Sequence, residues 1–354
     1  LYFGSQTAGI IYSEDMGENW QNIDLFGEKN ISLIWTDSEG KLFIAGCSGE
    51  ANSPDGLTRG HTLYCSTDGL KSFVPLTAPD PVKYENSSYY GLVPQRITSD
   101  SRYIYITFAS SGEVFYGGMG AYACDTGSLS GGKVYRYRIE NGLTVFDKDI
   151  TPEDHIPCGY SGICSNGKML LLSTVCRKNG GDIIYTSTDS GESWKTIMNR
   201  LEYSRFDWNI PYMKPQYNGG GNCVHWISDI KLSPFDSDTA LFNTGTGLFM
   251  ITGLASGDVL VKPFCEGIEE TVHLNVYTTP HGRNRIIDII GDLGGFAFED
   301  YDSECENSFA NENGDRYITC LNADLTLSDP EYIVATPPVS YTHLRAHETL
   351  ANLV

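Results

Sequence analysis

The sequence is short of basic residues and has no long apolar run. Lysine and arginine together number 24, against 45 aspartates and glutamates, so the formal net charge is −21 over 354 residues. Such an acidic chain repels phosphate backbones, which argues against nucleic-acid binding. No run reaches the roughly 18 apolar residues that a membrane-spanning helix needs. We therefore expect neither a nucleic-acid nor a membrane partner.

Closely spaced cysteines and helical periodicity are also lacking. The ten cysteines include no C-x-x-C pair, the usual spacing of a structural zinc site, so no metal and no other cofactor is expected. The sequence leaves open whether these cysteines are buried thiols or disulfides. What it does contain is glycine (38) and tyrosine (22), which favour turns and half-buried strands. An all-β fold is expected.

One short pattern recurs along the chain: an apolar strand, a tight polar turn and an aromatic residue. It fits S-x-D-x-G-x-x-W in full twice, and a third copy is degenerate because its glycine, Gly69, sits one place early. The copies comprise Ser13, Asp15, Gly17 and Trp20; Ser66, Asp68 and Phe73; and Ser187, Asp189, Gly191 and Trp194.

The residue types in this pattern suit a structural turn. The Asp carboxylate can accept backbone N–H groups of its own turn, the Gly permits a positive φ, and the aromatic residue can pack on a neighbouring layer. The pattern resembles the Asp-boxes of sialidases, sortilin-like receptors and several glycosidases, which lie away from the catalytic site. The resemblance implies a folding role for Asp15, Asp68 and Asp189, with Trp20, Phe73 and Trp194 as packing residues.

A second type of hairpin alternates with the Asp-box hairpins, so that two hairpins make four short antiparallel strands. This unit recurs about every 45 to 70 residues, which is typical of the blades of a β-propeller. Long inserts at 79–90, 112–132 and 202–223 are rich in Gly, Tyr and Asn. Such inserts usually shape one face of a propeller, where ligands bind.

Three motifs in the second half make a resemblance specific. They are Trp226-Ile-Ser-Asp-Ile-Lys-Leu-Ser-Pro-Phe-Asp, Gly267-Ile-Glu-Glu-Thr and Gly291-Asp-Leu-Gly-Gly-Phe296. Their order and spacing resemble glycoside hydrolase family 74, the xyloglucanases, over about residues 1–338. The resemblance implies two tandem seven-bladed propellers with a cleft between them. It places later blades of the first propeller at 1–265 and the first blade or blades of the second at 266–339.

The resemblance assigns the general acid to Asp292. This residue follows the apolar run 286–290 and precedes two glycines, which would let a substrate approach the backbone closely. Donating a proton near neutral pH requires a raised pKa, from burial or from a nearby carboxylate such as Glu299, Asp300 or Asp302. The alternative is a turn Asp that caps its own Gly-Gly bend.

An inverting glycosidase also needs a carboxylate base, roughly 6.5–9.5 Å from the acid. No second Asp-x-Gly-Gly occurs before Asp292, and the chain starts at Leu1 without a signal peptide. We therefore expect a truncated fragment whose base lies upstream and which is inactive alone. The segment 340–354 resembles a translated adaptor sequence. Its His343 and His347 are not expected to bind a metal, because no Glu follows the first His.

Sugar binding needs flat aromatic faces beside hydrogen-bonding groups. Where the family tends to have a Trp-Trp pair, this chain has His225-Trp226, so Trp226 is expected either to stack on a sugar ring or to be a core Trp between blades. The other substrate-binding candidates are aromatic residues of the inserts and of the Asp292 motif: Trp208, Tyr212, Tyr217, Tyr116 and Phe296.

The expected function is cleavage of the β-1,4-glucan backbone of xyloglucan by an inverting acid/base mechanism, with endo and chain-end action both open. The resemblance implies a secreted monomer with a polysaccharide partner. The alternative is a non-catalytic Asp-box propeller, sortilin-like or carbohydrate-binding. A sialidase is disfavoured, because Arg138-Ile-Glu fails the Arg-Ile-Pro pattern at its third place.

Overall fold

The computed structural model consists of β-strands and their connections, without a helix among the residues it describes. None of these residues forms a helix able to cross a bilayer. The described residues are 1–5, 8–23, 31–47, 63–76, 92–110, 131–140, 143–153, 156, 158–175, 177, 181–199, 206–207, 224, 226–245, 247–268, 271–291, 293–303, 309–310, 317, 319–326 and 328–336.

The chain divides into two compact units. The first comprises Leu1–Asp207 and Val224–Lys262, and the second comprises Trp208–Cys223 and Pro263–Val354. The division at Pro263 lies close to the boundary expected at 265/266 between two propellers. That the units are portions of two propellers, and that 340–354 is a foreign tail, remain predictions.

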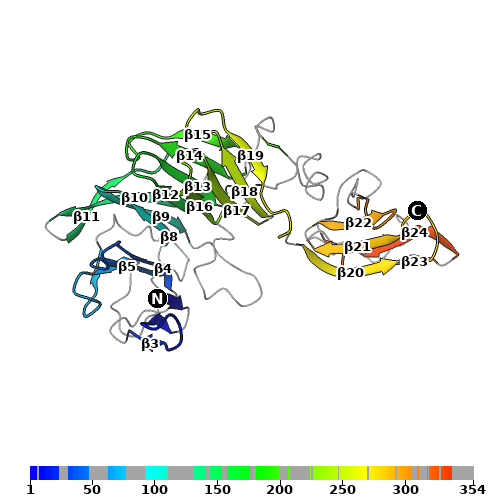
Figure 1. Cartoon of the computed structure of the whole chain (residues 1–354), viewed down its shortest axis with the longest axis horizontal. Helices are drawn as coiled ribbons and strands as arrows, with labels where there is room; N and C mark the ends of the chain where they lie inside the picture. The colour runs from blue at the N-terminus through cyan, green and yellow to red at the C-terminus, as the bar shows by residue number, and fades with distance from the viewer. Residues whose placement is uncertain are drawn as a thin grey trace. The chain divides into compact units, whose positions relative to one another are not determined.

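The described residues of the first unit form five sheets, and in each of them strands that follow one another in the chain pair antiparallel (Figure 1). The prediction of an all-β fold with four-stranded blades is confirmed, since four of the five sheets have four strands. The sheets are β1 (Tyr2–Ser5), β2 (Gly9–Tyr12) and β3 (Gln21–Asn22); β4 (Ile31–Thr36), β5 (Phe43–Cys47), β6 (Leu63–Ser66) and β7 (Val74–Pro75); β8 (Leu92–Ser99), β9 (Tyr103–Ser110), β10 (Gly132–Glu140) and β11 (Leu143–Asp149); β12 (Gly159–Ser165), β13 (Leu170–Val175), β14 (Ile183–Ser187) and β15 (Lys195–Asn199); β16 (Asp229–Leu232), β17 (Ala240–Thr244), β18 (Gly247–Thr252) and β19 (Leu260–Pro263).

The first strands of successive sheets pack next to each other, as in a propeller. β4 contacts β8, β8 contacts β12, and β12 contacts β16. Gly162 permits the close approach of β12 to β16, because a Cβ there would lie 2.5 Å from the backbone nitrogen of Ile230. Apolar residues fill the space between the sheets: Ile106 and Ile44 belong to one buried cluster, and Tyr105 and Ile163 to another.

Each four-stranded sheet has two distinct ends, because its strands alternate in direction. The turns that join the first to the second strand and the third to the fourth lie at one end. All three Asp-box turns lie at this end, which we call the Asp-box end. Two of them join the third and fourth strands of their sheets, β6 to β7 and β14 to β15, and the other joins β2 to β3, the last two strands of the three-stranded sheet. The other end carries the start of the first strand and the link between the second and third strands, and we call it the opposite end.

The second unit contains a three-stranded sheet of β20 (Val272–Thr278), β21 (Ile286–Gly291) and β22 (Gly294–Phe298), and a hairpin of β23 (Asn322–Thr326) and β24 (Asp329–Thr336). Ile287 and Ile289 of β21 form a core with Cys320 and Ala323. Side chains alternate between the two faces of a strand, so Asp288 and Ile290 lie on the other face of β21.

Candidate functional site

The carboxylates of the three Asp-boxes are engaged within their own turns. Asp15 accepts the Asn19 backbone N–H at 2.8 Å and the Asn19 side-chain amide at 2.6 Å. These hydrogen bonds, the side-chain one first, lower the pKa of Asp15 from 3.8 to about 2. The hydroxyls and backbone N–H groups of Ser72 and Ser193 lower the pKa values of Asp68 and Asp189 to about 2 in the same way. Acids this strong stay ionised near neutral pH and cannot serve there as proton donors.

Two consecutive residues with positive φ shape each of these turns. They are Met16 and Gly17 in the first box and Ser190 and Gly191 in the last. In the degenerate box, Gly69 fills the first position and Leu70 takes the second with φ of 66°. The same turn therefore forms in all three copies, and the misplaced glycine leaves a leucine in the left-handed region.

The aromatic residues of the boxes pack in different ways. The Trp194 indole Nε1 donates to the Ile150 carbonyl of the preceding sheet at 2.7 Å. Trp20 instead makes an edge contact with Phe3 of its own sheet. Phe73 belongs to a cluster that spans the first two sheets. We assign all three a packing role.

An ion-pair network that the motifs do not reveal joins the third sheet to the last Asp-box. The Arg136 side chain, only 7 % exposed, pairs with Asp147 at 2.6 Å and with Glu192 at 2.9 Å. It also donates to the Ser190 carbonyl at 2.8 Å and lies over the Tyr103 ring, 4.4 Å from its centroid. The Asp-box end is thus held together by local turns and by contacts between sheets.

Trp226 lies at the opposite end, just before β16, and is 50 % exposed. Its φ is 57°, in the left-handed region that costs an L-residue free energy. Its neighbours Val224 and Ile227 are fully buried. A core Trp between blades would be buried, and Trp226 is half-exposed. That Trp226 stacks on a sugar ring stays a prediction.

The Trp226 segment is anchored by a buried carboxylate, that of Asp182, which directly precedes β14, the third strand of the preceding sheet. Asp182 has no exposed surface. Its carboxylate accepts the Thr174 hydroxyl at 2.8 Å and backbone N–H groups of Arg177 (3.1 Å), Ile227 (3.2 Å) and Trp226. Burial raises the pKa of Asp182, and these hydrogen bonds oppose the increase.

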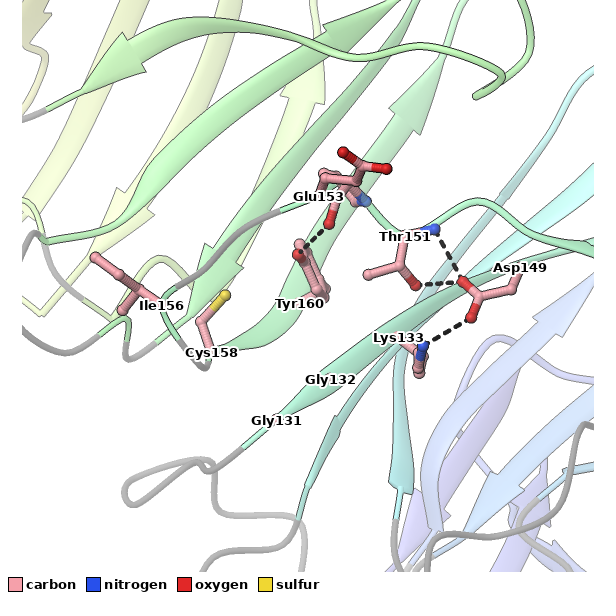
Figure 2. A pocket seen from close by; sticks show the side chains of 10 residues that line it. Gly131, Gly132, Lys133, Asp149, Thr151, Glu153, Ile156, Cys158 and Tyr160 are labelled. Atoms are coloured by element: carbon pink, nitrogen blue, oxygen red, sulfur yellow. Dashed lines mark hydrogen bonds and ion pairs between the residues drawn. The ribbon is translucent and has the colours of Figure 1, made fainter.

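A cavity of about 480 Å³ lies between the third and fourth sheets of the first unit. Figure 2 shows Asp149 in its wall, bonded to the Lys133 ammonium at 2.7 Å and to the Thr151 backbone N–H at 3.0 Å. Tyr160 donates to the Pro152 carbonyl at 3.5 Å. Two carboxylates and one ammonium group are among the lining residues, which are Gly131, Gly132, Lys133, Asp149, Thr151, Pro152, Glu153, Ile156, Cys158 and Tyr160.

Several predicted site residues lie outside the described residues. Tyr116 belongs to the segment that connects β9 to β10. The last residue of β9 and the first residue of β10 lie at the opposite end of the third sheet. The described residue Val224 precedes His225 directly. The predicted site residues outside the described ranges are Asp292, His225, Trp208, Tyr212, Tyr217 and Tyr116.

The strands on either side of Asp292 are described, and they pair as a hairpin: Ile290 faces Gly294 and Asp288 faces Phe296. Asp288 is a carboxylate within β21, and its side chain is 12 % exposed and pairs with Nδ1 of His273 at 2.9 Å. His273 Nε2 in turn contacts the Thr271 hydroxyl at 2.6 Å. The motif did not reveal Asp288, because it sits inside an apolar run.

Phe296, expected to bind substrate, is only 2 % exposed and packs against Ile290. Its pairing with Asp288 puts it on the same face of the sheet as Asp288 and Ile290. Because its side chain is buried there, the site proposed below leaves it out. The carboxylates expected to act on Asp292 have local partners. Glu299 pairs with Arg283 at 2.5 Å, and Asp300 accepts the Asp302 N–H at 2.8 Å.

Within the described ranges, no three His, Cys, Asp or Glu side chains converge in a way that could hold a metal ion. His343 and His347 lie outside those ranges.

Comparison with known proteins places these features in a family context. No protein-family model matches the chain. It is 23 % identical over 357 residues to an oligoxyloglucan-reducing end-specific xyloglucanase of Emericella nidulans. This alignment covers 85 % of this chain and 42 % of the relative. A xyloglucanase of Acetivibrio thermocellus is 23 % identical over 85 % of this chain and 37 % of its own length. The chain thus spans less than half the length of these curated relatives.

The fold is shared with solved structures. The crystal structure of the family 74 xyloglucanase from Xanthomonas campestris superposes with a TM-score of 0.74 at 20 % identity, covering 96 % of this chain and 47 % of that one. The fold defines an all-β protein of the propeller class. The resemblance to glycoside hydrolase family 74 that the motifs indicated is confirmed.

Proposed function

We propose that this chain is part of a glycoside hydrolase that cleaves the β-1,4-glucan backbone of xyloglucan, and that Asp292 is its general acid. The observation that carries the proposal is the Gly291–Phe296 motif at the end of a buried strand, in a chain similar to xyloglucanases over 85 % of its length. The mechanism is inverting and needs no cofactor, because carboxylates and water suffice. The proposal assigns only the acid to this chain.

The substrate lies along the opposite end of the first unit. Trp226 offers an exposed aromatic face there, and the cavity beside Asp149 offers hydrogen-bonding groups. Aromatic faces bind the apolar faces of sugar rings, and polar groups fix their orientation. His225 and the insert residues Tyr116, Trp208, Tyr212 and Tyr217 extend this proposed surface.

The proposal also bears on where and how the protein acts. Xyloglucan is an extracellular polymer, so we infer that the protein is secreted. Its acidic charge suits a neutral polysaccharide partner and discourages binding to polyanions. Each cleavage event needs one acid and one base, so we propose that it acts as a monomer.

The test is reducing-sugar release from xyloglucan by the full gene product that carries this chain, compared with its Asp292→Asn variant. General acid catalysis contributes about 10²–10⁴-fold, so the variant should lose at least that much activity on an unactivated substrate. Asp324→Asn is the matched control, because Asp324 is an exposed carboxylate on β23 of the same unit. It should keep full activity.

Two outcomes would contradict the proposal. Unchanged activity in Asp292→Asn would mean that Asp292 is a turn residue and that another residue is the general acid. Binding of xyloglucan without hydrolysis of any β-glucan would favour a non-catalytic carbohydrate-binding propeller.

A further inference from the structure

We propose that Asp182 is a positioning residue for the sugar-binding platform: its carboxylate holds the backbone of Trp226 in the conformation that presents the indole at the opposite end. This inference rests on the proposed function, which makes Trp226 a platform. The role assigned to Asp182 is conformational, so it can be tested without any sugar.

Asp182 holds the Trp226 segment through three hydrogen bonds. Its backbone N–H donates to the Val224 carbonyl at 3.3 Å. Its carboxylate accepts the N–H groups of Trp226 and Ile227, the latter at 3.2 Å. Asp182 and Ile227 are 45 residues apart and belong to neighbouring sheets, so the contact fixes the start of one sheet against the next.

The environment of Asp182 is built for a carboxylate. Each described partner of its two oxygens is a donor, namely one hydroxyl and three backbone N–H groups. A buried carboxylate is costly unless its lone pairs are satisfied in this way. An asparagine would keep one acceptor oxygen but turn an NH₂ group toward N–H donors. The substitution is almost isosteric, so it removes the anchor without leaving a large cavity.

The hydrogen bonds of Asp182 hold Trp226 in a backbone conformation that few described non-glycine residues of this chain adopt. Trp226 is one of four described non-glycine residues with positive φ, and the other three belong to Asp-box turns. Those three sit in turns stabilised by their own Ser and Asp side chains. Trp226 lies outside such a turn, and the carboxylate that binds its N–H comes from another sheet. Backbone strain is expected at functional sites that require one conformation. At Trp226, a buried carboxylate that is distant in sequence holds the strained backbone of an exposed aromatic residue.

The experiment uses the full chain labelled with 5-fluorotryptophan, whose five Trp residues each give a ¹⁹F resonance. Trp226→Phe identifies the Trp226 signal by its loss. We expect Asp182→Asn to shift or broaden that signal and leave the other four in place. Binding of a xyloglucan oligosaccharide should weaken at least about tenfold in the same variant, and in Trp226→Ala as well.

Asp147→Asn is the matched control. Asp147 is another poorly exposed carboxylate of the first unit, but it pairs with Arg136 at the Asp-box network. A shift of the Trp226 signal in this control would reveal a global effect and overturn the proposal, as would an unmoved signal in Asp182→Asn. If Asp182→Asn fails to fold, the double variant with Trp226→Gly should recover folding, because glycine adopts the left-handed conformation without help. Failure of that recovery would also overturn it.

The two proposals fail in distinguishable ways. If the wild-type chain binds no xyloglucan, the proposed function fails, and the ¹⁹F spectra still decide the role of Asp182. If the chain binds xyloglucan and Asp182→Asn binds equally well with an unchanged Trp226 signal, only the role of Asp182 is refuted.

Discussion

The strain at Trp226 can be measured by replacing this residue with alanine and with glycine in separate variants. Both changes remove the indole, so their difference reports on the backbone alone. At φ of 57°, the left-handed conformation costs an L-residue about 1–2 kcal/mol. Glycine escapes this cost but loses about 0.4–1 kcal/mol through the greater freedom of its unfolded chain. Trp226→Gly should therefore be more stable than Trp226→Ala by about 1 kcal/mol.

The assay is urea unfolding, with midpoints and slopes compared between the two variants. Ile139 supplies the control, because it is 55 % exposed and lies in β10 with extended backbone. There the order should reverse, with alanine more stable than glycine by about 0.5–1 kcal/mol. The reasoning is refuted if Trp226→Ala is as stable as Trp226→Gly while the control pair behaves normally.

Two further predictions concern the Asp-box end. Arg136→Met leaves the poorly exposed Asp147 carboxylate without its main partner, so it should lower the unfolding free energy by about 3 kcal/mol, measured by urea unfolding. Adding Asp147→Leu should recover part of this loss. A loss below about 0.5 kcal/mol in the single variant would contradict the prediction. The pKa of Asp189 is lowered from 3.8 to about 2, so its hydrogen bonds contribute stability above pH 3.8 that is lost as the pH falls toward 2. The stability difference between wild type and Asp189→Asn should therefore shrink across that window, and a difference constant from pH 5 to pH 2 would count against it.

The features that could be predicted from the sequence are those fixed by neighbouring residues. The Asp-box turn needs Ser, Asp and Gly within a few positions, and the hydrogen bonds from Asn19 to Asp15 connect residues only four apart. Strand alternation and turn composition likewise predicted four-stranded sheets. Even the degenerate box was recognisable, although the pattern did not indicate that Leu70 would adopt a positive φ.

The features that could not be predicted depend on contacts between sheets. Asp182 precedes an ordinary apolar strand, and nothing near it in sequence indicates that its carboxylate binds a segment 45 residues away. Arg136 was unremarkable for the same reason, since its Ser190 partner is 54 residues distant. Phe296 was a substrate-binding candidate because of its place in the Gly291–Phe296 motif, and the motif did not indicate that its side chain would be buried against Ile290.

The two ends of the first unit differ in the burial and the partners of their carboxylates, and this difference supports the proposed position of the ligand. At the Asp-box end, Asp15, Asp68 and Asp189 are exposed, and their carboxylates accept hydrogen bonds within their own turns. At the opposite end, Asp182 is fully buried, and its charge serves the strained residue Trp226 of the next sheet. Burying a charge and straining a backbone both cost stability, and a core would be more stable without them. Their joint presence beside an exposed indole supports the proposal that Trp226 offers a fixed aromatic surface to a sugar chain.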